Sequence, residues 1–354
     1  MKLAIVGTGI AGMTAAHLLH RDHDLTIYEA GEYIGGHTDT VEVERAGKTY
    51  AVDTGFIVFN DWTYPNFISL LDRLGVASQP SDMSFSVRSE ETGLEYNGTS
   101  LNGLFAQRRN LLRPPFYRMI RDILRFNRES VRLLEEPGPG PSLGDYLEAH
   151  RYSPPFIRHY IVPMAGAIWS AGPATIWQSP ARYLVQFFKN HGMLSVNERP
   201  TWRVITGGSQ RYVEKLVRPF RDRIRLRSPV AAIVRHPEEV EVRVRDRTGL
   251  CHTERFDGVV LACHSDDALA LLADPSPLER EILGAIRYQR NEAVLHTDRS
   301  LLPKRRLAWA AWNYHLLPAP ADRVLVTYHM NTLQRMAAPC EFCVTLNRSD
   351  AIDP

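Results

Sequence analysis

The chain has 354 residues, of which 44% are hydrophobic and 23% are charged, and its formal net charge is +2. These values are ordinary for a globular protein of two or three domains, and they give no reason to expect a nucleic-acid partner. The four cysteines, the lack of a signal-peptide pattern and the lack of a bilayer-length apolar run argue against a disulfide-rich or membrane-spanning protein. We therefore expect a cytoplasmic protein.

The first elements of the chain form a β-α-β pattern. A short apolar run at residues 3–6 predicts a buried strand, residues 10–19 predict a helix, and residues 25–28 predict the next strand. Such a unit requires a parallel sheet with a right-handed crossover. The pattern then predicts, in chain order, a hairpin over 43–55, an amphipathic helix over 64–75 ending at Gly75, and paired strands over 84–98.

The middle of the chain, residues 104–195, is helical in pattern and rich in aromatic residues and arginine, and Ser142 is placed to cap a helix. Strands and helices alternate again beyond this region. The later predicted elements are a strand, double-glycine turn and helix over 201–216, strands over 224–236, 240–246 and 256–263, a helix over 265–273, and strands over 306–316, 323–331 and 340–347.

Three glycines between the first strand and the first helix carry the strongest local signal. Gly7, Gly9 and Gly12 make the pattern G-x-G-x-x-G. The first glycine permits a tight turn, the second lets the backbone approach a pyrophosphate, and the third lets the helix pack closely on the strand. The pattern alone is weak, but its place between a strand and a helix favours a dinucleotide site.

Glu29 ends the second predicted strand. A carboxylate there can accept hydrogen bonds from the ribose hydroxyls of an adenosine, and its charge disfavours the 2′-phosphate of NADP. The alternative is a solvent-facing glutamate at the end of a strand.

The segment "GGHT" distinguishes between NAD and FAD, which both fit the residues before it. Gly35 and Gly36 allow the backbone to come close to a longer cofactor, and Thr38 can bind a phosphate or ribityl oxygen. NAD enzymes have no general need for this second glycine pair. We therefore expect FAD, although a turn with no ligand is the alternative interpretation.

These motifs, followed by "DTGFIVFN" at residues 53–60, resemble the flavin-containing amine oxidase superfamily. This superfamily includes monoamine oxidases, protoporphyrinogen oxidase, phytoene desaturases and flavin-dependent fatty-acid isomerases. A narrower likeness is to bacterial FAD-binding proteins associated with cyclopropane-fatty-acid synthases and to the N-terminal oxidase-like half of plant cyclopropane synthases. The segments that carry the narrower likeness are "HTDTV", "DTGFIVFN", "NGTSLNGLFAQRRNLLRP", "PMAGAIWS" and "VTLN".

The resemblance implies an α/β fold. It consists of a Rossmann-type FAD-binding domain with a parallel sheet, discontinuous in sequence over 1–80 and 200–270, and an inserted mixed substrate domain rich in helices over 81–199 and 271–354. Asp53 is expected near the flavin. The cofactor-binding residues implied are Gly7, Gly9, Ile10, Ala11, Gly12, Glu29, Ala30, Gly35, Gly36, His37, Thr38, Gly55 and Val230. Superfamily members usually continue to a glycine-rich and aromatic segment that closes over the cofactor, and we expect that segment to be missing here.

The resemblance also implies an FAD-dependent oxidoreductase of the oxidase or desaturase type, which transfers a hydride from a hydrophobic, lipid-derived substrate to the flavin. Two alternatives stay open: a flavin-dependent double-bond isomerase, and a non-catalytic flavin-binding partner of a lipid methyltransferase. Net electron flow to an acceptor would separate the oxidoreductase from the isomerase. A lack of flavin reduction by any lipid would favour the non-catalytic partner.

The sequence identifies no catalytic base. His37 could move a proton beside a flavin, or it could be a loop histidine bound by backbone groups. Other side chains could line a substrate pocket, although each is equally consistent with a packed residue. They are Tyr96, His159, Trp169, His191 and His264.

Two further patterns have competing interpretations. Cys340 and Cys343 form a lone C-x-x-C, and because no second pair completes a zinc site we expect no metal, only two thiols in or beside a strand.

Residues 117–134 form a basic amphipathic helix that could lie on an anionic membrane at the inner membrane face. The alternative is a surface helix whose apolar side packs on the core. The apolar face was assigned to Ile120, Ile123, Leu124, Asn127, Val131 and Leu134, and the basic face to Arg118, Arg121, Arg125, Arg128 and Arg132.

Overall fold

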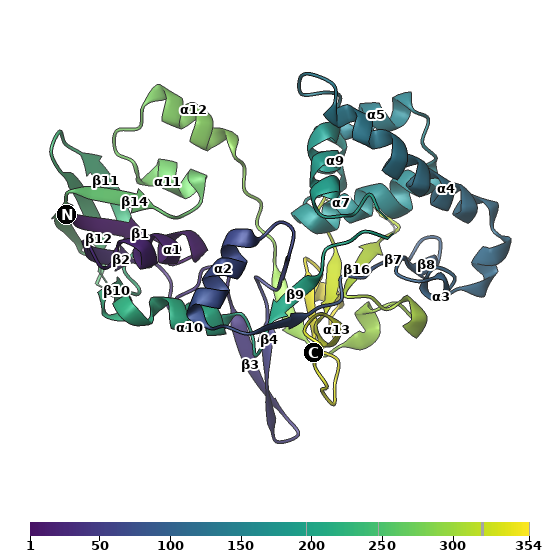
Figure 1. Ribbon diagram of the computed structural model, residues 1–354, viewed down its shortest axis with the longest axis horizontal. Helices are drawn as coiled ribbons and strands as arrows, with labels where there is room; N and C mark the ends of the chain where they lie inside the picture. Colours follow the sequence, from purple (N-terminus) through teal and green to yellow (C-terminus); the bar gives the residue numbers. More distant parts are fainter. Residues whose placement is uncertain (196, 247, 320–321, 354) are drawn as a thin grey trace. The chain divides into compact units, whose positions relative to one another are not determined.

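The computed structural model describes residues 1–195, 197–246, 248–319 and 322–353. The chain divides into two compact units (Figure 1). The first unit comprises Met1–Val41, Leu71–Ala77 and Ile205–Gln289, and the second comprises Glu42–Leu70, Ser78–Val204 and Arg290–Pro354.

These units differ from the predicted domain ranges at the short segments 78–80 and 200–204, which lie in the second unit, and in two longer segments. Residues 42–70 belong to the second unit, because strand β5 (Val58–Asn60) pairs with β9 (Trp202–Ile205) in a three-stranded sheet. Residues 271–289 belong to the first unit, because helix α12 (Pro277–Ala285) packs against α11 (Ser265–Leu271).

The first unit is built on a parallel sheet of four strands in the order β10-β2-β1-β14. Helix α1 (Ile10–Leu19) connects β1 to β2, which gives the predicted β-α-β unit, and the α/β, Rossmann-type fold is confirmed. An antiparallel sheet in the order β11-β12-β13 completes the unit, and Phe256 of β13 packs edge-on against Tyr28 of β2. The strands are β1 (Lys2–Val6), β2 (Asp24–Tyr28), β10 (Ile224–Arg225), β11 (Val230–Arg235), β12 (Val240–Arg245), β13 (Cys251–Phe256) and β14 (Gly258–Leu261), and the remaining helix is α10 (Gln210–Val217).

The second unit combines a mixed sheet of six strands with a layer of helices that covers one of its faces (Figure 1). The strand order is β15-β18-β17-β16-β7-β8, and only the β16–β7 pair is parallel among the described pairs. These strands are β7 (Phe85–Ser89), β8 (Glu95–Asn97), β15 (Ala293–His296), β16 (Trp312–Leu316), β17 (Val326–His329) and β18 (Cys343–Leu346). The helices are α3 (Leu101–Leu104), α4 (Pro114–Glu129), α5 (Leu143–Ala149), α6 (Pro154–Phe156), α7 (Val162–Trp169), α8 (Pro173–Gln178), α9 (Ala181–Asn190) and α13 (Met330–Leu333).

Most of the predicted local elements are present. The predicted hairpin is β3 (Thr40–Arg45) with β4 (Lys48–Asp53), and the predicted amphipathic helix is α2 (Pro65–Leu74), which ends at a left-handed Gly75. Strand β6 (Ser78–Pro80) joins β5 and β9 in their sheet. Ser142 caps α5 as predicted, because its hydroxyl accepts a hydrogen bond of 3.1 Å from the backbone N–H of Asp145.

Helix α4 packs differently from the predicted helical face. Its buried side consists of Phe116, Met119, Asp122 and Phe126, and Ile120 and Ile123 pack partly against the same core. The grouping of Leu124 with Ile120 and Ile123 on one face was wrong, because its side chain is 54% exposed while those two pack against the core. None of the helices in the described ranges is long and apolar enough to cross a bilayer.

Candidate functional site

In the loop between β1 and α1, two positions must be glycine because the surrounding backbone leaves no room for a side chain. Gly7 has a positive φ of 103°, and a Cβ atom there would lie 2.5 Å from the carbonyl oxygen of Ala262. A Cβ atom at Gly12 would lie 2.0 Å from the carbonyl oxygen of Gly7. Neither position has room for a side chain, so both glycines follow from the tight turn and the close packing of α1 on the sheet.

Gly9 is different from its two neighbours in the motif. Its φ of −66° and ψ of 176° are open to any residue, and a Cβ atom built on it would meet nothing within 4 Å. Neither conformation nor packing within the chain therefore explains a glycine at this position. Gly9 has no side chain that could cap α1, so the N–H groups of the first helical turn, including those of the exposed residues Ile10 and Ala11, have no partner within the helix. This arrangement fits an anionic group that comes into direct contact with the backbone.

Glu29 connects the second strand to the same loop. One carboxylate oxygen accepts hydrogen bonds from the backbone N–H of Thr8 at 2.9 Å and from its hydroxyl, and the other accepts from Gly31 N–H at 2.8 Å. A carboxylate has about four acceptor positions, so a ribose hydroxyl would take the remaining position or displace Thr8. Thr8, which is fully buried, could not be identified from the sequence, because its role depends on a contact between two loops.

The "GGHT" segment packs directly onto the fingerprint loop. A Cβ atom on Gly36, which has a φ of +59°, would lie 2.9 Å from the Cα atom of Gly9. Gly35 has a φ of +141°, and the carbonyl oxygen of Thr38 would lie 2.5 Å from its Cβ atom. The Thr38 hydroxyl is buried and lies 2.5 Å from the hydroxyl of Tyr212, so the contact shown for it is within the protein.

Three exposed rings lie in a stack beside these loops. The ring of His37 is stacked on His264 with 5.7 Å between centroids, and His264 is stacked on Tyr288 with 4.1 Å between centroids. His264 follows β14, so the structure brings two of the predicted histidines together at the carboxyl ends of the parallel strands. That edge of an open α/β sheet is where ligands bind.

The remaining predicted cofactor residues are divided between the two units. Ala30 follows Glu29, and Val230 begins β11, close to Glu29 because Ser228 N–H donates to the Glu29 carbonyl at 2.8 Å. Gly55 belongs to the second unit, as does the buried Asp53, whose carboxylate accepts a hydrogen bond from the Gln334 amide.

A cavity of about 280 Å³ lies within the second unit. Three methionines and several aromatic rings line it, and no aspartate or glutamate occurs among the described residues of its wall. Tyr96 and His191, two of the predicted pocket residues, are part of this wall. Trp169 packs on Phe187 beside it, with 5.0 Å between ring centroids, and His159 accepts a hydrogen bond from the Tyr96 hydroxyl through its carbonyl. The methionines are Met83, Met164 and Met193, and the rings include Phe85, Phe187, Trp202 and Trp312.

The polar groups of this cavity are neutral or cationic. Burial raises the pKa of Tyr96 well above its usual value and raises the pKa of Tyr160 to about 12, so both phenols keep their protons at neutral pH. Arg199 is the one lining residue with a permanent charge among the described residues of the wall. The cavity therefore offers apolar contact, hydroxyl donors and one guanidinium, but no group that would neutralise a cation.

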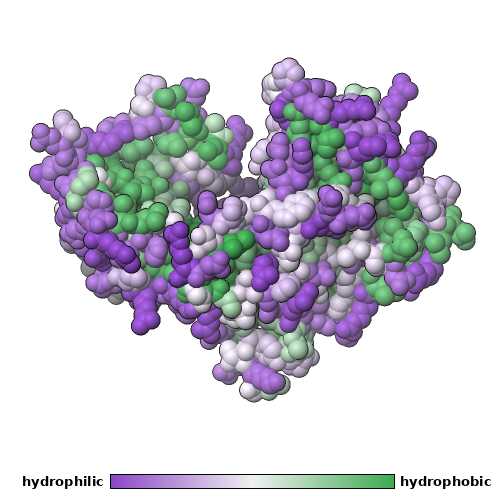
Figure 2. Space-filling model, in the orientation of Figure 1, coloured by the Kyte–Doolittle hydropathy of each residue, from purple (hydrophilic) through white to green (hydrophobic). Residues whose placement is uncertain are grey.

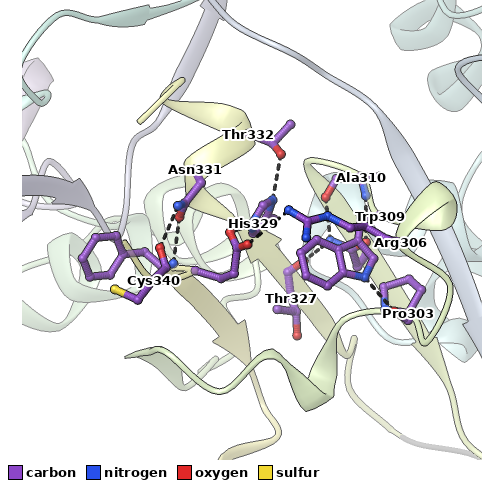
Figure 3. Close-up of polar contacts among 12 residues, drawn as sticks. Pro303, Arg306, Trp309, Ala310, Thr327, His329, Asn331, Thr332 and Cys340 are labelled. Carbon is purple, nitrogen blue, oxygen red and sulfur yellow. Dashed lines mark hydrogen bonds and ion pairs between the residues drawn. The ribbon is translucent and has the colours of Figure 1, made fainter. Parts of the chain in front are cut away.

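A second polar cluster in this unit was not predicted (Figure 3). His329 is bound through both ring nitrogens, at 2.7 Å to the Thr332 hydroxyl and at 2.8 Å to Glu341. Arg306 lies 3.7 Å from the same carboxylate and stacks over Trp309. Both ring nitrogens of His329 are thus engaged, and the cluster connects the end of β17 to the segment before β18. No periodicity in the sequence indicates it, since its residues come from separate turns.

Comparison with known proteins agrees with this geometry. The family described as "Flavin containing amine oxidoreductase" matches residues 10–296, which is most of the chain. The chain belongs to the flavin-containing amine oxidoreductase family. Membership implies a flavin cofactor, and the open backbone at Gly9 beside Glu29 fits the pyrophosphate and ribose of a flavin dinucleotide.

The individual relatives are distant. Zeta-carotene desaturase from Solanum lycopersicum is 40% identical over 76 residues, which are 21% of this chain and only 12% of that enzyme. The conjugated-linoleic-acid-producing ("CLA-producing") fatty acid isomerase from P. acnes has a TM-score of 0.65 at 17% identity, covering 99% of this chain and 78% of that one. Cyclohexylamine oxidase from Brevibacterium oxydans has a TM-score of 0.65 at 16% identity, covering 100% of this chain and 78% of that one. At these identities the structural likeness shows a shared fold.

Proposed function

We propose that this member of the flavin-containing amine oxidoreductase family is an FAD-dependent oxidoreductase that oxidises a hydrophobic, lipid-derived substrate which is neutral or anionic. The observation that carries the proposal is the wall of the 280 Å³ cavity, which is rich in methionine and aromatic residues and contains no described carboxylate. An alkylammonium substrate would lose its hydration there without gaining a counter-ion, which is costly in an apolar site.

An acyl chain suits the same wall. Methionine side chains adapt their shape to long flexible ligands, and the buried phenols of Tyr96 and Tyr160 remain neutral. Arg199 lies at the wall with an exposed side chain, so a fatty-acid carboxylate could pair with it. The cavity residues would bind the chain and exclude water, while Gly9, Glu29 and the first turn of α1 would hold the FAD.

When bound, the flavin supplies the hydride-accepting chemistry, and no residue of the chain is assigned as a base. The substrate loses a hydride and a proton from adjacent carbons, which leaves a double bond, and an acceptor such as oxygen or a quinone takes the electrons in turn. The names of two similar proteins, a zeta-carotene desaturase and a fatty acid isomerase, agree with a hydrophobic substrate without fixing the product.

A double-bond isomerase is the second candidate, and the apolar cavity supports it equally. A flavin-binding partner of a lipid methyltransferase is the third, suggested by the likeness of "DTGFIVFN" and "PMAGAIWS" to proteins associated with cyclopropane synthases.

Anaerobic mixing of the purified holoprotein with unsaturated fatty acids, and with alkylamines of equal chain length, tests the proposal. The account expects bleaching of the flavin absorbance by a fatty acid and none by the amine. Conversion of the fatty acid to a positional isomer without an acceptor would identify the isomerase. Bleaching by the amine alone would refute the proposed substrate class.

A further inference from the structure

A continuous stretch of the second unit combines positive charge with exposed apolar side chains. Between Glu95 and Asp122 the sequence contains no acidic residue. Its arginines are Arg108, Arg109, Arg113, Arg118 and Arg121. All net charge on this segment is therefore positive, whereas the whole chain is nearly balanced at +2.

Large apolar side chains in the same stretch point into solvent. The exposed fractions are 77% for Leu101, 47% for Leu111, 87% for Leu112 and 46% for Tyr117. The stretch is folded, because the Tyr117 hydroxyl donates a hydrogen bond of 3.0 Å to the Leu111 carbonyl and its ring lies 6.0 Å from that of Phe105. Figure 2 shows apolar side chains reaching the surface, among polar ones, in the region where Figure 1 places α3 and the start of α4.

The outer face of α4 continues this surface. Residues at helical spacing opposite the buried Met119 and Phe126 alternate between arginine and apolar side chains. Leu124 on this face is 54% exposed. We call the set of Leu101, Leu111, Leu112, Tyr117 and Leu124 together with Arg108, Arg109, Arg113, Arg121 and Arg128 the leucine–arginine surface.

This surface is not the helical face expected from the sequence. Ile120 and Ile123 are committed to the core, and Arg125 is folded back over the Tyr152 ring at 4.0 Å and beside Asp122 at 3.5 Å. The apolar groups available to a membrane therefore come from the loop before α4 and from its outer face.

A polar hollow of about 730 Å³ adjoins the surface and shares Arg108 and Arg109 with it. The two acidic residues of its wall are already engaged. Glu90 pairs with Arg348 at 2.8 Å, and Glu95 accepts hydrogen bonds from the backbone N–H groups of Lys304 and Arg305. No described acidic side chain pairs with the ammonium of Lys304 or the guanidinium of Arg305. The hollow thus keeps an excess of positive charge and suits a phosphate group.

We propose that the leucine–arginine surface docks the protein on an anionic lipid membrane, with the exposed leucines and Tyr117 in the headgroup layer and the arginines on lipid phosphates. Protruding leucines among arginines, with no acidic residue over 96–121 and, among the described ion pairs, only Arg128 paired, with Glu129 at 3.0 Å, match a surface that is anionic outside and apolar beneath. An acidic protein would satisfy the arginines, but it would not explain why Leu112 and Leu101 are so exposed.

Docking would also serve the proposed function, on which this last step rests. Gly98 and Thr99, which line the 280 Å³ cavity, are separated from Leu101 only by Ser100 in the sequence. A lipid-derived substrate could therefore pass from the bilayer to the cavity along the same segment.

Flotation of the holoprotein with phosphatidylcholine vesicles, with and without about 30% phosphatidylglycerol, tests the docking without requiring turnover. The two test variants are Leu111→Ser/Leu112→Ser and Arg113→Gln/Arg121→Gln. Controls at exposed positions outside this surface are Leu278→Ser, where the side chain is 62% exposed, and Arg218→Gln/Arg221→Gln. All variants are first checked for native circular dichroism and flavin content.

We expect salt-sensitive binding to the anionic vesicles only, lowered about tenfold or more by each test variant and unchanged by the controls, since each arginine near an anionic surface is worth about fivefold. Failure to float at low salt would overturn the proposal, and so would binding that depends on the arginines but not on the leucines, as expected for purely electrostatic adsorption. If the protein floats but no lipid reduces its flavin, the docking stands and the proposed oxidation fails. If a lipid reduces the flavin but the protein does not float, the oxidation stands and the docking fails.

Discussion

The two glycines of the fingerprint loop should respond in opposite ways to the same substitution. Gly9→Ala places a methyl group in open space, on a backbone with a φ of −66° that any residue adopts. Gly12→Ala places the same methyl group 2.0 Å from the Gly7 carbonyl oxygen. The first change should therefore affect only what binds to the loop, and the second should affect the fold itself.

The expected magnitudes follow from these distances. At Gly9 the free energy of unfolding of the apoprotein should change by less than about 1 kcal/mol, the usual range for this exchange at the start of a helix. If the methyl group displaces one charge-assisted hydrogen bond to a pyrophosphate, FAD should bind about 1.5–3 kcal/mol more weakly, or roughly ten- to hundredfold. At Gly12 the overlap with backbone should lower the free energy of unfolding by about 1–3 kcal/mol or more.

Urea unfolding of the apoproteins and titration of FAD into them, followed by flavin fluorescence, measure the two quantities separately. Gly9→Trp extends the series and should abolish FAD binding while leaving the apoprotein folded. The reasoning is refuted if Gly9→Ala binds FAD as tightly as the native protein, or if Gly9→Ala and Gly12→Ala destabilise the apoprotein equally.

Three further predictions concern other residues. Glu29→Ala should weaken FAD binding by about 1–3 kcal/mol, as for a lost charge-assisted hydrogen bond, and an unchanged dissociation constant would show that the carboxylate only supports the Thr8 loop. Arg199→Gln should weaken binding of a fatty acid about tenfold but leave its methyl ester unaffected, and equal losses for acid and ester would exclude a carboxylate partner. Burial lowers the pKa of His315 to about 3, so the unfolded chain takes up a proton below its ordinary pKa of about 6.5 that the folded protein does not. Stability should therefore fall by about 2 kcal/mol from this residue as the pH drops from 6.5 to 5, and His315→Gln should show a correspondingly flatter urea-stability profile over that range.

The sequence predicts the local elements well where one physical rule dominates. The strand–loop–helix over residues 2–19 was predicted almost to the residue, because a buried apolar run, a glycine turn and a helix follow one another without competing patterns. Strands β13 and β15 and helix α12 were missed, since their sequences have little apolar alternation and α12 has no buried residue.

The face of α4 shows the limit of periodicity. Ile120, Ile123 and Leu124 form an apparent apolar stripe, but the protein buries the larger Phe116 and Phe126 and accommodates Asp122, which accepts a hydrogen bond of 2.9 Å from Ser153 N–H. Which residues of α4 are buried depends on the elements that pack against it in the tertiary fold, and the sequence of the helix alone does not specify those elements.

In the candidate site, too, some residues could be identified from the sequence and others could not. The glycines were identified because backbone conformation and close approach restrict the residue type locally. Thr8 under Glu29, Tyr212 on Thr38 and the hydrogen-bond partners of His329 were not identified, because no local pattern of the sequence indicates these contacts.

Identification of the cofactor carried by the purified full-length protein tests the central claim most directly. The account predicts an absorbance band near about 450 nm, and release of FAD, free of the protein, on heat denaturation. Release of NAD without any flavin, or a folded protein that neither contains flavin nor takes up added FAD, would contradict it.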